Sequence, residues 1–538
     1  MRIARPTVSS GVLCLATALY LLAFTNTPFW QKLGAYFAAH PSKLIVGGTA
    51  VFLVHVAILL VFSHRVILKP MIMLLVLVAA GGSYFADTFG TIIDRNVVEA
   101  ALTTTSAESG ALITPNFLLH MMVYGVIPCL LVALIRLSDP PFLRKLAVNT
   151  LICIICLVGA LILIGSDYGS FSSMYREHRV DIMGRLMPSA VIRSLASYAT
   201  HSVSDRRIVM KPLGVDAKQT LPSLLSGKKL LTIIVVGETA RAANFSLFGY
   251  DRATNPELAK QAVVAFPNTA SCGTDTAVSL PCMFSPFTRV EYTQSKFRGS
   301  ENLLDVLKHA KVQVAWFENN TGSKGVADRI EYKDLQAFDD KRFCESGECK
   351  DQILIESLKH YFGSIRGNTT VVLHMTGSHG PAYFRRYPQE FAKFKPDCRT
   401  SQFSDCTAEE IRNAYDNSIL YTDHILSELI NLLQANEGEF ASSMIYMSDH
   451  GESLGENGLY LHAAPYFMAP EVQTHVPFIA WFSPEYASAT KLDVSCLKAG
   501  AAEAASHDNL FHTVLGMTGV ATSVYDQSLD RFSDCRRK

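Results

Sequence analysis

Acidic and imidazole side chains stand beside glycine at the ends of three apolar segments, a pattern that can bind a metal ion. They are Glu238 in GET, His379 in SHG, and Asp449 and His450 in SDHG, with His462 in a loop soon afterwards. Glycine permits a tight turn and a close backbone approach to a ligand, and carboxylate and imidazole groups suit zinc. Each motif alone is common in turns or near helix starts. Their coincidence at three segment ends indicates one combined site.

A hydroxyl-rich loop supplies candidate nucleophiles for such a site. It runs through NTASCGTDTAVSLPC, and Cys272 and Cys282 bracket most of it. A threonine or serine hydroxyl becomes a nucleophile when a metal ion stabilises its alkoxide. Spacing leaves four hydroxyls open as candidates, with helix capping as the alternative role. These are Thr269, Thr274, Thr276 and Ser279.

These motifs need elements that bring distant segments together. Short apolar runs rich in β-branched residues predict buried strands of a parallel sheet, at Leu230–Val236, Val312–Phe317, Thr370–Met375, Ser443–Met447 and Val476–Phe482. Helical stretches lie between them, among them Asn302–Ala310, Lys350–Phe362 and Ala408–Asn436. This alternation predicts a doubly wound α/β domain, in which ligands bind at the carboxyl ends of the strands.

The first third of the chain predicts a membrane domain instead. Five uncharged apolar stretches approach or reach the ~20 residues that a helix needs to cross a membrane. They are the segment between Arg5 and Lys32, then Leu44–Phe62, Pro70–Ala86, Phe117–Ile135 and Leu146–Gly165. We expect the first span to be an uncleaved anchor. The small residues at Ala38-Ala39 also fit a cleaved leader, which would leave an even number of spans.

Charged residues between the spans predict the orientation. One side of a five-span path carries Arg2, Arg5, Arg65, Lys69, Arg136, Arg144 and Lys145, and the other carries Lys32, Lys43 and Arg95. Because basic loops favour the cytoplasm, the N-terminus is expected there. Five crossings then deliver everything after about Gly165 to the opposite face of the membrane.

Cysteine usage predicts an oxidising compartment for the later part of the chain. Of twelve cysteines, four lie in the apolar spans and eight lie beyond residue 270. Three closely spaced pairs predict disulfides, and these are Cys272/Cys282, Cys344/Cys349 and Cys398/Cys406. Cys496 and Cys535 remain as a fourth pair by arithmetic alone. Zinc ligation is the alternative, but no CxxC pairs or fitting histidine spacings accompany these cysteines.

The 538 residues therefore divide into three regions. We expect a transmembrane domain of five helices at 1–166, a membrane-surface linker at 167–227 and a catalytic domain at 228–538. Hydrophobic residues make up 49% of the chain, which excludes disorder for most of it. Basic and acidic side chains balance at 48 each. A nucleic-acid partner is not expected, because phosphate binding requires a basic surplus.

Four segments together resemble the phosphoethanolamine transferases that modify lipid A, which belong to the alkaline phosphatase and sulfatase superfamily. The segments are GETARAANFSLFGYDRATNP, SCGTDTAVSLPCMFS, TGSHGP and SDHGES. The resemblance covers nearly the whole chain. It implies an α-helical five-span transmembrane domain plus an α/β doubly wound, alkaline phosphatase-like soluble domain. It also implies a monomer in the bacterial inner membrane, with its catalytic domain in the periplasm.

The resemblance also implies a role for each site residue. Thr276 matches the nucleophile. The implied zinc ligands are Glu238, Thr276, Asp449 and His450. His379 and His462 match histidines that line the substrate phosphate or a second, weaker metal position, and either would serve as general acid. Asn320 and Lys324, in ENNTGSKGV, match residues that hold the phosphoethanolamine group. One zinc ion is implied, with a second as the alternative.

The implied reaction moves phosphoethanolamine from phosphatidylethanolamine to a phosphate of lipid A through a phosphothreonine intermediate. It would lower the negative charge of the lipopolysaccharide and favour resistance to cationic peptides such as polymyxin. The alternatives are transfer to a core sugar, a membrane-bound phosphodiesterase or phosphatase, and a receptor with structural zinc. The oxygen-rich donor set disfavours the receptor. Sulfatase activity is disfavoured because no C/S-x-P-x-R motif occurs, and SPFTR at 285–289 misplaces the proline.

Overall fold

The computed structural model describes residues 6–104, 106–205, 208–220, 227–345 and 347–537, which form two compact units. The first unit comprises Met1–Val98 and Ile113–Thr200, and the second comprises Glu99–Leu112 and His201–Lys538. Helix α10 (Tyr168–Met183), which falls in the predicted linker, is part of the first unit. The limits 1–166, 167–227 and 228–538 stay a prediction.

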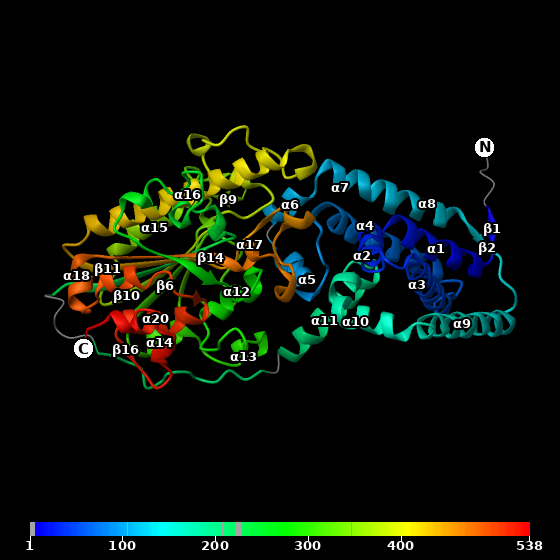
Figure 1. The fold of residues 1–538 in the computed structure, drawn as a ribbon, viewed down its shortest axis with the longest axis horizontal. Coiled ribbons are helices and arrows are strands. Elements are labelled where there is room, and N and C mark those ends of the chain that lie inside the picture. Colours follow the sequence, from blue (N-terminus) through cyan, green and yellow to red (C-terminus); the bar gives the residue numbers. More distant parts are fainter. Residues whose placement is uncertain (1–5, 105, 206–207, 221–226, 346, 538) are drawn as a thin grey trace. The chain divides into compact units, whose positions relative to one another are not determined.

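Apolar helices build the first unit (Figure 1). Four described helical segments are long and apolar enough to cross a membrane. They are α3 (Pro41–Val61), α4 (Leu68–Phe89), the continuous run α7–η1–α8 (Pro115–Leu134) and α9 (Phe142–Gly165). They correspond to the second to fifth predicted spans, each within a few residues of the expected bounds.

The first predicted span is a bent helix pair. Helices α1 (Ser10–Phe24) and α2 (Thr27–Tyr36) meet at 71° and count as a fifth span only if the pair is one broken span. Pro28, in the first turn of α2, has no backbone N–H and cannot continue the hydrogen bonding of α1. The amide of Asn26 then donates to the carbonyls of Leu21, at 2.9 Å, and Met187, at 3.0 Å. At the buried break, the Asn26 side chain therefore satisfies backbone carbonyls that would otherwise lack a donor.

An eight-stranded mixed sheet forms the centre of the second unit, in the order β15-β5-β14-β11-β4-β10-β6-β7. The strands are β4 (Lys229–Gly237), β5 (Val264–Ala270), β6 (Gln313–Glu318), β7 (Glu331–Asp334), β10 (Thr369–His374), β11 (Phe440–Ser448), β14 (His475–Phe482) and β15 (Ala505–Ser506). All five predicted strands are present. The five neighbours from β11 to β7 are parallel, so their carboxyl ends meet at one edge.

The sheet differs from the prediction in the direction of one strand and in three strands, β5, β7 and β15, that were not predicted. Strand β14 is antiparallel to β11 rather than parallel. The connection between them holds only short turns, a small hairpin and α17 (Glu471–Thr474), and an antiparallel neighbour needs no crossover helix. Strand β5 was not predicted, because Pro267 interrupts its pattern. The register between β5 and β14 shifts beside this proline, which marks a bulge.

Helices cover both faces of this sheet (Figure 1). On one face lie α15 (Gln352–Phe362) and α16 (Ala408–Ala435), and on the other lie α12 (Thr276–Met283), α14 (Leu303–His309) and α20 (Asp508–Met517). The predicted helices at 302–310, 350–362 and 408–436 are confirmed. Fully buried side chains such as Ile234, Phe266 and Ile445 fill the core between the layers.

Four disulfides stabilise the loops of the second unit. The three predicted pairs, Cys272–Cys282, Cys344–Cys349 and Cys398–Cys406, are confirmed. The two remaining cysteines, Cys496 and Cys535, form the fourth bond. The cysteines of the apolar spans are free thiols.

Candidate active site

Three residues from two adjacent strand ends form the centre of the candidate site. Glu238 follows β4, and Asp449 and His450 follow β11, whose last residue pairs in register with Gly237. All three side chains are fully buried. Each offers one ligand atom, and these atoms lie within 4.8 Å of one another. The parallel pairing of β4 and β11 therefore brings together residues more than 200 positions apart in the sequence.

Thr276 reaches this centre from the first turn of α12. The preceding residue, Asp275, caps the helix by accepting a hydrogen bond from the Val278 amide at 3.0 Å. The Thr276 hydroxyl lies 3.3 and 3.2 Å from the two carboxylate oxygens of Glu238 and 3.4 Å from His450 Nε2. The cap fixes the start of the helix, and the hydroxyl points at the acidic cluster.

The other candidate hydroxyls of this loop have different surroundings. Thr269 donates to the Phe266 carbonyl at 3.3 Å, and Thr274 donates to the Ala464 carbonyl at 2.6 Å. Ser279 is fully buried within α12. The geometry thus favours Thr276 among the four hydroxyls that spacing alone left open.

The donor atoms of the cluster face one another in an arrangement that a cation would stabilise. His450 Nδ1 lies 2.9 Å from its neighbour's carbonyl, at Gly451, and donates to it. Its Nε2 lone pair then points at Glu238 Oε1, 3.4 Å away, and at Asp449 Oδ2, 3.3 Å away. That Asp449 oxygen is buried and accepts no hydrogen bond from any residue the structure describes. Two electron-rich atoms in contact repel one another, so a metal ion or a proton between His450 Nε2 and Asp449 Oδ2 would stabilise this arrangement.

The protonation states agree with metal binding. Burial lowers the pKa of His450 to about 3, so its imidazole is neutral at pH 7, the form that binds metals. Burial and the Glu238 carboxylate raise the pKa of Asp449 well above its ordinary value, which reflects the cost of two carboxylates in one site. Two carboxylates and one imidazole are ligands that suit a catalytic zinc ion, and the Thr276 hydroxyl would take the fourth position, which holds the reacting group.

Glycines let the backbone pack tightly around the cluster. A Cβ on Gly451 would lie 2.0 Å from the Val472 carbonyl oxygen. Gly377 has φ +55°, and a Cβ there would lie 2.7 Å from the Glu238 carbonyl oxygen. The glycines noted beside the site residues in the sequence are therefore required by close contacts.

His379 and His462 lie beside the cluster, as predicted from the sequence. The ring centres of His462 and His450 are 4.6 Å apart, and those of His462 and His379 are 5.3 Å apart. His462 Nδ1 bonds Glu452 Oε2 at 2.9 Å, which leaves Nε2 as the other titrating atom of the ring. Although burial opposes charging, the Glu452 carboxylate raises the pKa of His462 to about 9.

The sequence prediction assigned no role to Glu452. The residue lies within SDHGES, and the structure buries it completely. Besides His462, it accepts a hydrogen bond from the Tyr383 hydroxyl at 2.7 Å. The available signal in the sequence was an acidic residue, Glu452, two positions after His450. Its partner His462 lies ten residues further on, and the sequence did not show that the two side chains would meet.

Asn320 contacts the cluster directly. Its amide nitrogen donates to Glu238 Oε2 at 2.6 Å and lies 3.3 Å from His374 Nε2. Its backbone N–H donates to Glu318 Oε1 at 2.7 Å. Lys324, in the same loop, has φ +50° and donates to the Thr321 carbonyl at 2.8 Å. The structure therefore brings Asn320 to the cluster.

Glu318 and His374 are two further residues that the sequence prediction missed. They end the neighbouring strands β6 and β10, are both buried, and bond through His374 Nδ1 at 2.9 Å. The indole of Trp316 donates to the same carboxylate at 2.8 Å. A charged residue at the end of an apolar strand was the signal, since burying it requires such partners.

Comparison with known proteins gives matches along most of the chain. The family model described as phosphoethanolamine transferase EptA/EptB matches residues 51–203, and the sulfatase model matches residues 231–520. The chain is 41% identical to phosphoethanolamine transferase EptA of Escherichia coli K12, over 87% of this chain and 86% of that protein. It is 35% identical to phosphatidylethanolamine transferase Mcr-1 of Escherichia coli, over 89% and 90%.

A solved structure resembles this one over its full length. The integral membrane lipooligosaccharide phosphoethanolamine transferase A (EptA) of Neisseria meningitidis superimposes with a TM-score of 0.95 at 33% identity. The match covers 99% of this chain and 100% of that one.

Proposed function

The chain belongs to the family of phosphoethanolamine transferases, and from this premise we propose that it moves phosphoethanolamine from phosphatidylethanolamine to a phosphate of lipid A. It is a protein of the bacterial inner membrane with its catalytic domain in the periplasm. The observation that carries the proposal is the Thr276 hydroxyl, which points at Glu238 and His450 within 3.2–3.4 Å.

We propose that Glu238, Thr276, Asp449 and His450 hold one zinc ion. The bound ion would lower the pKa of the threonine hydroxyl and offset negative charge on the phosphoryl oxygens. Two observations support this assignment: Asp449 Oδ2 accepts no hydrogen bond from the described residues, and the lone pair of His450 Nε2 points into the cluster. His379 and His462 are the candidates for a second, weaker metal position.

In the first step the Thr276 hydroxyl would lose its proton to water, and its oxygen would bond to the phosphorus of the donor lipid. The bond between phosphorus and the diacylglycerol oxygen would break, and diacylglycerol would leave. His462 would give a proton from Nε2 to the leaving oxygen, because its Nδ1 is engaged by Glu452. His379, whose ring is adjacent, is the alternative acid. The product of this step is a phosphoethanolamine ester of Thr276.

Asn320 and Lys324 would hold the phosphoethanolamine group during transfer. The Asn320 amide nitrogen is directed at Glu238 and His374, so its carbonyl oxygen is the atom left to accept a hydrogen bond from the substrate ammonium. In the second step a lipid A phosphate attacks the phosphothreonine and restores the hydroxyl. The product carries less negative charge, which favours resistance to polymyxin.

Replacing Thr276 tests this proposal. Thr276→Ala should abolish transfer, with a loss of at least ~10³-fold, while the melting temperature stays near that of the wild type. Thr276→Ser keeps the hydroxyl and should retain measurable activity. Mass spectrometry of lipid A after incubation with phosphatidylethanolamine reports transfer. Wild-type turnover by the alanine variant would refute the nucleophile, and release of free phosphoethanolamine instead of modified lipid A would indicate a hydrolase.

A further inference from the structure

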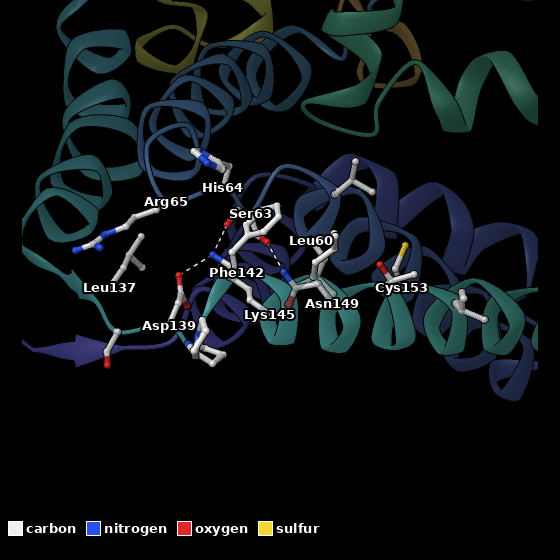
Figure 2. A pocket seen from close by; sticks show the side chains of 17 residues that line it. Leu60, Ser63, His64, Arg65, Leu137, Asp139, Phe142, Lys145, Asn149 and Cys153 are labelled. Carbon is white, nitrogen blue, oxygen red and sulfur yellow. Dashed lines mark hydrogen bonds and ion pairs between the residues drawn. The ribbon is translucent and has the colours of Figure 1, made fainter.

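A cavity of about 1080 Å³ lies in the first unit, away from the residues of the catalytic cluster (Figure 2). Its walls come from the end of α3, the following loop, the segment from β2 (Arg136–Leu137) to Pro141, and the start of α9. By the charge distribution of the loops, these ends of the spans face the cytoplasm. The volume lies just above the ~300–1,000 Å³ typical of ligand pockets.

One end of the cavity is a fixed polar network. Lys145 Nζ donates to the Ser63 carbonyl at 2.5 Å and to Asp139 Oδ2 at 2.6 Å. Asn149 donates to the Ser63 hydroxyl at 2.5 Å, and the Ser10 backbone amide donates to Asp139 Oδ1 at 2.8 Å. Figure 2 shows Asp139, Lys145, Ser63 and Asn149 connected in a row. Lys145 thus neutralises Asp139 and still has one N–H beyond these two bonds.

The charge that remains at this end is positive. Arg65 is exposed and lines the cavity, and among the described residues no carboxylate pairs with it. His64 lies beside it on the same wall. An anion in the cavity would therefore meet a free guanidinium at one wall and the ammonium of Lys145 at the other.

The other end of the cavity is apolar and open to the surface of the helices. Leu60 and Cys153 lie further along the helices than the polar network (Figure 2). The apolar lining there is strongly exposed, with Val61 at 69%, Leu146 at 51% and Ile154 at 53%. In a membrane-spanning unit such side chains face acyl chains.

We propose that this cavity binds one anionic glycerophospholipid of the cytoplasmic leaflet. Its phosphate would bond Arg65 and Lys145, and one acyl chain would lie along Leu146 and Ile154. Basic pockets between membrane helices on the cytoplasmic side suit anionic headgroups. This lipid differs from the donor, because the donor is zwitterionic and reacts in the periplasm. Its role is to anchor the ends of α3 and α9.

A fluorescence experiment on the full-length protein tests this site. Phe142 lines the cavity and is 66% exposed, so Phe142→Trp supplies a reporter. The protein is placed in phosphatidylcholine vesicles with increasing brominated phosphatidylglycerol, which quenches nearby tryptophan. Half-maximal quenching should need about tenfold less phosphatidylglycerol than brominated phosphatidylcholine or phosphatidylethanolamine. That factor corresponds to one charge-assisted hydrogen bond.

Two variants on the reporter background separate a built site from general surface attraction. Arg65→Gln should raise the half-maximal phosphatidylglycerol fraction about tenfold. Arg144→Gln removes the same charge from the same region, but Arg144 does not line the cavity, so it should change the value less than twofold. Leu146→Phe fills the apolar end without adding a second tryptophan and should weaken quenching without any change of charge.

Three results would overturn the proposal. Equal losses in Arg65→Gln and Arg144→Gln would mean that only the surface potential attracts the lipid. Equal quenching by all three brominated lipids would mean that the cavity holds bulk lipid. No effect of Leu146→Phe would mean that no acyl chain lies in the cavity.

Discussion

At the scale of single residues, the evidence for a metal site is a buried carboxylate oxygen of Asp449 that accepts no hydrogen bond from the described residues. Asp449 Oδ2 is buried without a donor among the described residues, and the His450 lone pair faces it. By contrast, the buried Asp351 is fully supplied by Asn319, Thr376 and Gly377 at 2.8–2.9 Å. The hydrogen bonds of Asp351 are therefore satisfied by the protein, whereas one oxygen of Asp449 is left for a ligand.

This contrast predicts opposite effects of zinc on two variants. In protein treated with a chelator, Asp449→Asn should raise the stability by about 1–3 kcal/mol. It removes a carboxyl group that must either take up a proton on folding or hold an uncompensated charge beside Glu238. With zinc added, the same variant should melt below the wild type, because one ligand is lost. Asp351→Asn is the control and should be destabilised in both conditions. Thermal melts with and without zinc measure these shifts, and a destabilised Asp449→Asn apoprotein would contradict the metal site.

At the scale of elements, the ends of parallel strands position the catalytic groups. β4 and β11 carry the proposed metal ligands, and β6 and β10 carry Glu318 and His374, which contact Asn320. Helix α12 brings Thr276 to the cluster, and the Cys272–Cys282 disulfide ties the loop before this helix to its last turn. The geometry of the site therefore depends on strand register and on one constrained helix.

Glu318 is expected to act as a positioning residue. The Glu318 carboxylate accepts hydrogen bonds from the Trp316 indole and the Asn320 backbone N–H, and it also bonds His374. In Glu318→Gln an amide replaces one of these acceptor oxygens with a donor, so Asn320 should lose its fixed orientation. We expect kcat to fall about 10–100-fold, with little change in the donor KM and unchanged zinc content. Glu257→Gln is a matched control, because Glu257 also bonds a histidine, His424 at 3.1 Å, but on the partly exposed side of α16. A variant that loses zinc instead would indicate a structural role.

Removing the Cys272–Cys282 disulfide should reduce kcat more than removing another disulfide that stabilises the protein by a similar amount. Replacing both Cys272 and Cys282 with serine should lower the unfolding free energy by about 2–3 kcal/mol and reduce kcat through a less ordered Thr276. Replacing Cys398 and Cys406 opens a loop of similar length before α16 and should cost similar stability. Denaturant melts and initial rates at a temperature where both variants are folded make the comparison. Equal kcat losses in the two variants would contradict the role assigned to the first disulfide.

At the scale of the whole molecule, one chain combines a helical membrane unit with a disulfide-stabilised catalytic unit. Each unit has its own hydrophobic cores. Both substrates of the proposed reaction are lipids, so attachment to the membrane keeps the catalytic cluster at a high local concentration of donor. The membrane unit therefore contributes to rate without supplying a residue to the cluster.

Removing the membrane unit should lower the rate on membrane-bound lipid but not the rate on a soluble substrate. Residues 201–538 lack the first unit and also Glu99–Leu112 of the second unit. We still expect this fragment to unfold cooperatively and to bind zinc, because the sheet, both helical layers and all four disulfides are retained. Transfer from phosphatidylethanolamine vesicles should fall at least ~100-fold relative to the full chain. Cleavage of a soluble phosphodiester should change less than threefold. Equal rates on vesicles for both proteins would show that attachment is unnecessary.

Local pattern in the sequence determined the class of protein and the types of residue in its site. Runs of apolar residues gave four spans and five strands, because length and hydrophobicity fix these elements locally. The paired cysteines were readable for the same reason, since three pairs lie only five to ten positions apart. Motifs beside glycine predicted Glu238, Asp449 and His450 as one cluster, which the structure forms.

The tertiary structure decided what depends on contacts between distant segments. Thr276 meets Glu238 and His450 across 38 and 174 positions, and spacing alone did not distinguish its hydroxyl from three others. The partners Glu318, His374 and Glu452, the antiparallel direction of β14 and the break at Asn26 were likewise absent from the prediction. Their common cause is physical: a buried polar group is acceptable only beside a partner, and strand register and helix packing determine which partner arrives.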